Sequence, residues 1–194
     1  MSAESVPQPW RSFLRELDEA MTDNVGIHCL GGFVISACHG FPRPTSDLDF
    51  CEIVPSVSVK MVLQLAGRGS QLHKKHGVFL EKVTVATLPE GYEDRLQEMF
   101  PDVFAHIRLF ALDPYDLALS KLERNQDVDI EDVKYLARTV PFDLETLQQR
   151  YHSELRPLLG RPDREDVTLA LWVAAIEEER AVQAPTSPFY RGRL

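Results

Sequence analysis

The stretch Asp47–Val54 (DLDFCEIV) constrains the fold of this chain more than any other segment. Side chains at positions i and i+2 of a β-strand point to the same face, so Asp47 and Asp49 share one face. Leu48, Phe50 and Val54 share the other face, as core residues would. Neighbouring carboxylates repel each other and raise each other's pKa unless a cation lies between them. Because Mg²⁺ prefers oxygen ligands, the strand indicates a metal site, and the alternative is an edge strand whose acids face solvent.

The composition is that of a folded, acidic protein. The 194 residues are 44% hydrophobic and 26% charged, which fits one domain or a core with a small appendix and excludes disordered or collagen-like chains. The net charge of −9 argues against a broad surface for duplex nucleic acid. Residues 60–82 carry five basic side chains against the one acid Glu81, so they form either a local anion-binding surface or a solvated Lys-rich face.

The cysteines and the N-terminal sequence predict a cytoplasmic protein. Cys29, Cys38 and Cys51 are an odd number without CxxC spacing, which argues against a disulfide framework or a zinc ribbon. No apolar run approaches the roughly 20 residues of a membrane-spanning helix. The start MSAE lacks basic residues followed by an apolar stretch, so we do not expect secretion.

The expected elements divide the chain into three parts. The first part is mixed, with helices over 9–21, 33–39, 57–66 and 92–99 and strands over 25–30, 47–54, 77–87 and 105–111. Asp113-Pro114 then opens a run of helices, expected over 115–124, 130–138, 143–152 and 164–182. We therefore predict an α+β core over 1–112, in which helices flank a mixed sheet. A helical subdomain over 113–183 would pack on it, followed by a flexible tail over 184–194.

Two further features lie close to the acids in chain order. Gly31-Gly32 follows an apolar strand and precedes a short helix, as a backbone turn that binds phosphate would, and an ordinary tight turn is the alternative. Glu81 lies on an expected strand face that is otherwise apolar, with Phe79, Val83 and Val85. It is either a strand-edge residue or a third carboxylate that completes an oxygen-rich metal site.

A resemblance to the polymerase-β-like nucleotidyltransferase superfamily is carried by Gly31-Gly32-Phe33-Val34, His39-Gly40 and the run Arg43-Pro44-Thr45-Ser46-Asp47-Leu48-Asp49-Phe50. That superfamily has a Gly-Gly or Gly-Ser turn, then Asp-x-Asp, then a third acid on a later strand. The run is most similar to small bacterial nucleotidyltransferase-like proteins related to abortive-infection (type IV toxin–antitoxin) toxins. Asp116-Leu117, Lys121-Leu122, Arg124 and Asp129–Val133 are similar to a helical segment of those families, so the resemblance spans about 25–138.

The resemblance implies a polymerase-β-like core that transfers a nucleoside monophosphate (NMP) from an NTP to an acceptor hydroxyl. Asp47 and Asp49 would bind two Mg²⁺ ions, with Mn²⁺ as a substitute, and Glu81 would bind one ion and accept the nucleophile's proton. The acceptor would be tRNA, a protein or a small molecule, and an antitoxin protein is an expected partner. The residues implied to bind the nucleotide are Gly31, Gly32, Arg43, Thr45, Lys121 and Arg124.

Several of these residues have simpler alternatives. Arg43 could be an ordinary surface arginine and Lys121 a helical lysine that reaches solvent. Asp132 is expected to position Lys121 or Arg124, whereas Asp129 fits a first-turn acid that stabilises its helix.

Two departures from the family pattern support a second hypothesis. Gly32 stands where many active transferases have Ser, and Glu81 stands where they have Asp, followed by Lys82. The alternative is therefore a transfer-inactive protein of the same fold that binds a nucleotide or a partner.

Overall fold

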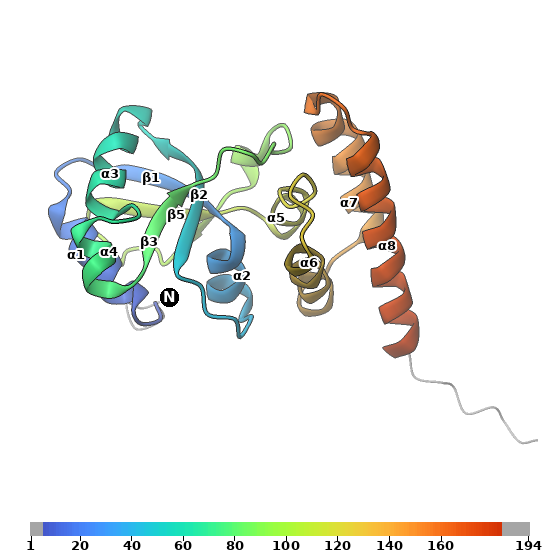
Figure 1. Ribbon diagram of the computed structural model, residues 1–194, viewed down its shortest axis with the longest axis horizontal. Coiled ribbons are helices and arrows are strands. Elements are labelled where there is room, and N and C mark those ends of the chain that lie inside the picture. Colours follow the sequence, from blue (N-terminus) through green and yellow to red (C-terminus); the bar gives the residue numbers. More distant parts are fainter. Residues whose placement is uncertain (1–5, 184–194) are drawn as a thin grey trace, which may run out of the picture.

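The computed structural model describes residues 6–183, and the expected tail over 184–194 lies outside them. Its chain folds as an α+β protein with one mixed sheet and flanking helices (Figure 1). The elements of the first part are α1 (Trp10–Ala20), β1 (Val25–Leu30), α2 (Gly31–His39), β2 (Asp47–Val54), η2 (Ser56–Ser58), α3 (Val59–Ala66), α4 (Gln71–His76), β3 (Phe79–Lys82), η3 (Tyr92–Arg95), β4 (Gln97–Met99) and β5 (Ile107–Ala111). They are followed by α5 (Pro114–Leu119), α6 (Asp127–Thr139), α7 (Leu144–Arg150), η4 (Tyr151–Leu155), η5 (Arg156–Leu158) and α8 (Asp163–Gln183).

The strands lie in the order β3-β2-β1-β5-β4. β1 pairs antiparallel with β2 and parallel with β5, while β3 runs parallel to β2 and β4 antiparallel to β5. The register places Leu48 beside Leu80 and Asp49 beside Glu81. Since side chains alternate between the two faces, one face of the β2–β3 pair carries apolar residues and the other carries acids.

The apolar face of the sheet forms the core. Ile27, Leu48, Leu80 and Leu109 are at most 1% exposed. Helix α1 adds three buried side chains at helical spacing, Phe13, Leu14 and Leu17. Figure 1 shows α1, α3 and α4 together at one side of the sheet. The acids of β2 and β3 face away from this core.

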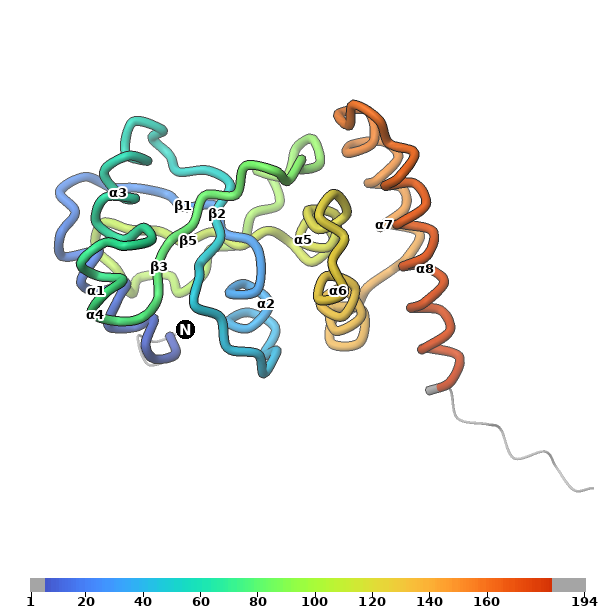
Figure 2. Tube along the Cα trace, in the orientation of Figure 1, coloured from blue at the N-terminus to red at the C-terminus, as the bar shows by residue number. Residues whose placement is uncertain are grey.

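All strands of the described chain precede Leu112, and only helices follow. The tube in Figure 2 shows α5–α8 side by side at the end of the molecule opposite α1, α3 and α4, with α2 between the two groups. A partly buried ion pair ties this helical part to the core, because Asp116 of α5 is 2.8 Å from Arg95 of η3. The division at residue 112 as a domain boundary stays a prediction. No helix among the described residues combines the length and apolar character needed to cross a membrane.

The strand predicted over 77–87 is too long. β3 ends at Lys82, and one further backbone bond joins the Val83 N–H to the Phe50 carbonyl at 2.9 Å. β2 has a bulge opposite His28 and Cys29, and the pairing of β2 with β3 ends at that point. Val85 is 73% exposed and does not continue an apolar strand face with Glu81.

Two helical segments also differ from the prediction. The stretch 92–99 forms only the short helix η3, and Gln97–Met99 instead pairs with β5 as strand β4. The sequence does not predict helix α4, although Ser70 caps it by accepting a bond from the His73 N–H at 3.1 Å. Its basic residues stand out in the sequence only as a charged stretch, and charge by itself carries no helical periodicity.

Helix α2 begins two residues earlier than predicted. Gly31 and Gly32 are its first residues, so they form no separate turn between β1 and the helix. Gly31 has φ +77°, a backbone conformation that L side chains rarely adopt. The change of direction therefore occurs within a single residue, directly at the end of β1.

Candidate metal and nucleotide site

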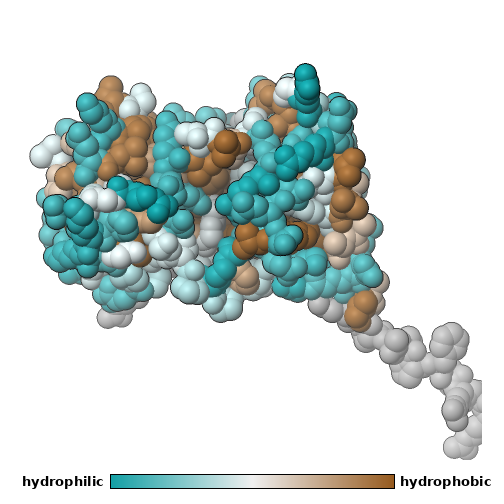
Figure 3. All heavy atoms as spheres, in the orientation of Figure 1, coloured by the Kyte–Doolittle hydropathy of each residue, from teal (hydrophilic) through white to brown (hydrophobic). Residues whose placement is uncertain are grey.

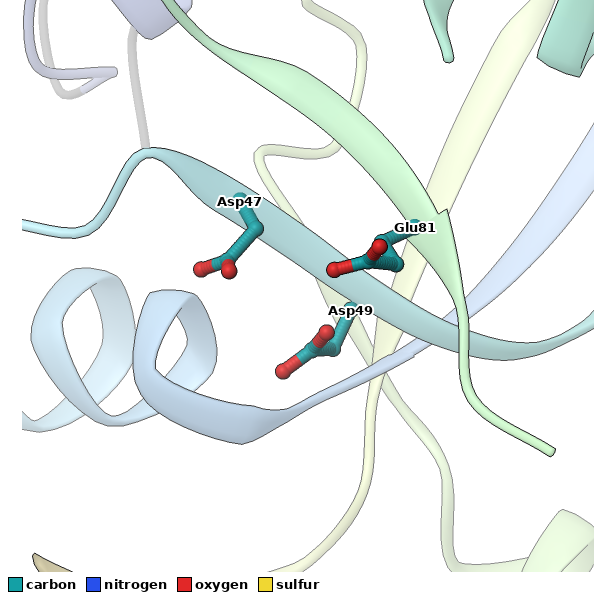
Figure 4. A group of neighbouring side chains, drawn as sticks. All are labelled: Asp47, Asp49 and Glu81. Atoms are coloured by element: carbon teal, nitrogen blue, oxygen red, sulfur yellow. The ribbon is translucent and has the colours of Figure 1, made fainter. Parts of the chain in front are cut away.

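Three carboxylates converge on the open face of the sheet. Asp47 and Asp49 extend from β2 and Glu81 from β3, and their carboxyl groups point to the same side of the two strands (Figure 4). One oxygen from each residue lies within 4.8 Å of the others. The parallel register of Asp49 with Glu81 produces this arrangement, because it sets the two side chains on the same face at neighbouring positions.

The electrostatics of Asp49 favour a cation beside its carboxylate. The pKa of its carboxyl is raised from 3.8 to about 6, first by burial and then by the charges of Asp47 and Glu81. Arg124 and Lys121 lower this pKa but do not offset the increase. Three carboxylates with all-oxygen donors are the chemistry that a hard divalent cation prefers. The residues present therefore fit Mg²⁺ or Mn²⁺.

Asp47 is held in place by its own chain. The Thr45 hydroxyl lies 2.5 Å from Asp47 Oδ1 and donates to it. The Asp47 N–H donates back to the same hydroxyl at 3.3 Å. Thr45, predicted to bind the nucleotide, thus orients a carboxylate of the candidate metal site.

Gly31 packs directly against Asp49. A Cβ atom built on Gly31 would lie 3.0 Å from the Cβ of Asp49 and would collide with its carboxylate. The first turn of α2 therefore lies against the acids, as Figure 4 also shows. The first N–H groups of a helix have no partner within it and favour an anion, so this turn adds positive potential beside the site.

A pocket of about 250 Å³ adjoins the acids. Asp49, Glu81 and Gly31 form one side of it, and Lys121 and Arg124 of the helical part form another. Lys82 at the end of β3 also lines the pocket, as does the loop after β3 with Val83, Thr84, Val85 and Ala86. The pocket thus has an acidic wall, a basic wall and an apolar loop.

The basic wall is fixed by buried acids of α6. Lys121 is only 4% exposed, and its Nζ lies 3.3 Å from Asp129 and 2.9 Å from Asp132. Arg124 donates from Nε to Asp129 at 3.0 Å. Burial alone would raise the pKa of Asp129, but the bonds from Arg124 and the Gln126 N–H outweigh burial and hold the pKa below its usual value. Asp129 therefore does more than stabilise the helix end.

Arg43 and Gly32 lie beside the pocket instead of lining it. The Arg43 guanidinium is 2.9 Å from Asp132, so Asp132 contacts both Arg43 and Lys121. Asp132 has the positioning contacts predicted for it with Lys121. A Cβ atom on Gly32 would lie 3.4 Å from Arg43, so the guanidinium occupies the space next to the glycine.

Sequence reasoning missed Arg68, which is the nearest basic partner of the third acid. Its Nη2 lies 3.3 Å from Glu81, and its guanidinium stacks over the Phe79 ring at 4.2 Å. Both side chains of this ion pair are largely exposed, 65% for Arg68 and 43% for Glu81. No spacing in the sequence indicates this contact, because it joins the loop after α3 to β3.

The histidines of α4 have structural contacts. His73 Nδ1 accepts a bond from the Gly69 N–H at 2.8 Å, and His76 Nε2 is 3.2 Å from Glu16. Among the basic residues of 60–82, Lys75 also pairs with Glu16, while Lys82 lines the pocket. The stretch is therefore partly a solvated, paired surface and partly a pocket wall.

Comparison with protein families gives one match. The family described as nucleotidyltransferase of unknown function (DUF6036) matches residues 13–179, a range that contains every residue of the site. Comparisons with curated proteins and with solved structures give no match.

Proposed function

Since the chain belongs to the nucleotidyltransferase family of unknown function (DUF6036), we propose that it transfers an NMP group from an NTP to an acceptor hydroxyl. The observation that carries this proposal is the convergence of Asp47, Asp49 and Glu81 beside a pocket with a basic opposite wall. Acids that gather metal ions and cations that gather phosphates are the two requirements of NMP transfer.

The three carboxylates bind metal ions in this reaction, and one of them also accepts a proton. Divalent cations held by the three acids would polarise the α-phosphoryl group and lower the pKa of the acceptor hydroxyl. Asp47 and Asp49 would hold the metal ions together with Glu81. Glu81, whose side chain is 43% exposed, accepts the proton of the acceptor hydroxyl. The acceptor oxygen bonds to the α-phosphorus, the bond to the bridging oxygen breaks, and pyrophosphate leaves.

The basic wall orients the triphosphate. Lys121 and Arg124 line the pocket and neutralise the β- and γ-phosphates, while the first turn of α2 approaches the acids from the other side. Arg43 contributes through Asp132, which it shares with Lys121. Many active transferases have Ser in place of Gly32, and its hydroxyl would contact phosphate. In this chain guanidinium and ammonium groups take over that contact.

The direct test is label transfer. The protein would be incubated with each α-³²P-labelled NTP, Mg²⁺ or Mn²⁺, and cellular RNA, protein or metabolites in turn. We expect label in one fraction and equimolar pyrophosphate, both lost in Asp47→Asn and Asp49→Asn. Asp23→Asn, an exposed loop aspartate, is the matched control and should retain the activity.

The acceptor class follows from the labelled fraction. Label in RNA would indicate tRNA-like acceptors, and label in protein would indicate hydroxyl side chains. A toxin-like role, with an antitoxin as partner, predicts growth arrest on expression that Asp47→Ala relieves.

A second candidate function rests on the Arg68–Glu81 ion pair. A guanidinium 3.3 Å from Glu81 competes with a metal ion for that carboxylate, which favours a nucleotide-binding protein without transfer activity. Saturable NTP binding with no pyrophosphate release from any acceptor fraction would support this function and overturn the first.

A further inference from the structure

Helix α8 has apolar residues on two opposite faces. Leu169, Trp172 and Ile176 are at most 5% exposed and pack into the helical part. Val167 and Leu171 lie on the other face and are 60% and 65% exposed. The apolar run of α8 therefore divides between the core and the surface, and packing into the core does not account for its outer half.

The exposed residues of α8 follow a regular spacing. Counting from Arg164, the exposed face recurs at Val167, Leu171, Ala174, Glu178 and Val182. These steps of three and four residues place the side chains in one line along the helix, the spacing of a helix–helix seam. We call this line the outer seam. Figure 3 shows brown surface along the outer edge of α8.

The outer seam carries two opposite charges at equal distances from Leu171. Arg164 and Glu178 are each seven residues from Leu171, about 10.5 Å at 1.5 Å per residue. Both are exposed, and neither has an ion pair among residues 6–183. An antiparallel copy of the same helix, crossing at Leu171, would bring each Arg164 next to the other Glu178.

We propose that the outer seam binds a second copy of this chain, with the two α8 helices antiparallel and a two-fold axis near Leu171. A two-fold interface must be self-complementary, and the seam meets this condition with Leu171 at its centre and one charge of each sign at equal distances. Antiparallel helices also align their dipoles favourably. The 21 residues of α8 span about 31 Å, long enough for about three heptads.

A second copy fits the seam better than a basic or an acidic partner. The chain has a net charge of −9, which would draw a basic partner to many acidic sites on its surface. The seam itself is charge-balanced, with one Arg and one Glu around an apolar centre. Only a partner with the opposite order of charges matches both ends, and this helix reversed has that order.

The test is the mass of the full-length protein in solution, measured by sedimentation over about 1–200 µM. We expect a concentration-dependent dimer of twice the 22.1 kDa chain. Leu171→Glu should weaken dimerisation by at least about tenfold, because it places two like charges at the two-fold axis. Val57→Glu, at an 85% exposed apolar residue outside α8, is the matched control and should leave the mass unchanged.

Charge reversal tests the antiparallel arrangement. Arg164→Glu and Glu178→Arg should each weaken the dimer several-fold, and the double variant should restore it. Circular dichroism would check that every variant keeps its helical content. A monomer at 200 µM, a dimer unaffected by Leu171→Glu, or a double variant no better than the singles would each overturn the proposal. Label transfer by the variants is a separate readout, so failure of the dimer and failure of the proposed function are distinguishable.

Discussion

The charge of Asp49 should destabilise the folded protein when no divalent cation is present. The ordinary pKa of an aspartate is 3.8, and that of Asp49 is about 6 in the fold, mainly because the carboxyl is buried. A difference of about two pKa units corresponds to about 3 kcal/mol, at about 1.36 kcal/mol per unit. Because the pKa of this acid is raised, the folded protein binds its proton more tightly than the unfolded chain does. The loss of folding stability is therefore absent below pH 3.8, develops between pH 4 and 6, and is complete above pH 6.

Replacing Asp49 with Asn removes this charge and should stabilise the protein. In urea denaturation with EDTA at pH 7.5, we expect Asp49→Asn to unfold with a free energy about 2–3 kcal/mol above that of the unsubstituted protein. At pH 4 the difference should shrink below about 1 kcal/mol. Asp23→Asn, at an exposed loop position, should change the free energy by less than about 0.5 kcal/mol at either pH.

A divalent cation should narrow this difference in stability. Mg²⁺ that binds only the folded protein adds RT ln(1 + [Mg²⁺]/Kd), or about 1.4 kcal/mol at ten times Kd. This gain should appear at pH 7.5 in the unsubstituted protein and be nearly absent in Asp49→Asn. If Asp49→Asn is the less stable protein at pH 7.5 in EDTA, contacts within the chain already compensate the charge, and these acids need no metal ion.

Three further predictions concern single contacts. Gly31→Ala should lower the free energy of unfolding by more than Gly77→Ala, because both glycines have positive φ but only Gly31 meets a neighbouring side chain. In urea denaturation the Gly77 variant should lose about 1–2 kcal/mol, and equal losses would show that the contact with Asp49 is unimportant. Asp18→Asn should lower the free energy of unfolding by about 2–3 kcal/mol at pH 7, since the Asp18 carboxylate accepts three backbone N–H bonds at 2.7–2.9 Å. The pKa of Asp18 is lowered in the fold, so this difference should fade as the pH falls below 3.8. Arg68→Met should increase Mg²⁺ affinity in calorimetric titration by up to about fivefold at low salt, and unchanged affinity would mean that the exposed pair does not compete with the cation.

The sequence predicts the acids of the site because they follow from strand geometry. Alternation sets Asp47 and Asp49 on the face opposite Leu48, and β2 has the predicted bounds. The bulge in β2 then shifts the alternation, so Val54, which we expected in the core, is 49% exposed and Ile53 is buried. β1 also begins and ends as predicted, since Gly31 and its positive φ mark its end. These local rules depend on neighbours in the chain and need no knowledge of the rest of the fold.

The errors arise where tertiary contacts decide the structure. Gln97–Met99 has no strong strand pattern and forms a strand because β5 offers it a partner. β3 stops at Lys82 because its neighbour bulges, although the sequence remains β-prone to Thr87. Contacts between distant segments, such as Arg68 with Glu81, leave no periodic signal.

The basic wall of the pocket depends on how the helical part packs against the core. Arg43 comes from the loop before β2, and Asp132 binds it at 2.9 Å while also binding Lys121. Removing one member of a buried charge network leaves its partners uncompensated, which is costly. A displacement of α6 relative to β2 would therefore break the Arg43–Asp132 contact and move Lys121 away from Asp49 and Glu81 together. The acids lie in the core and the basic wall of the pocket lies in the helical part. The affinity for a triphosphate should therefore fall when the packing between these two parts is disturbed.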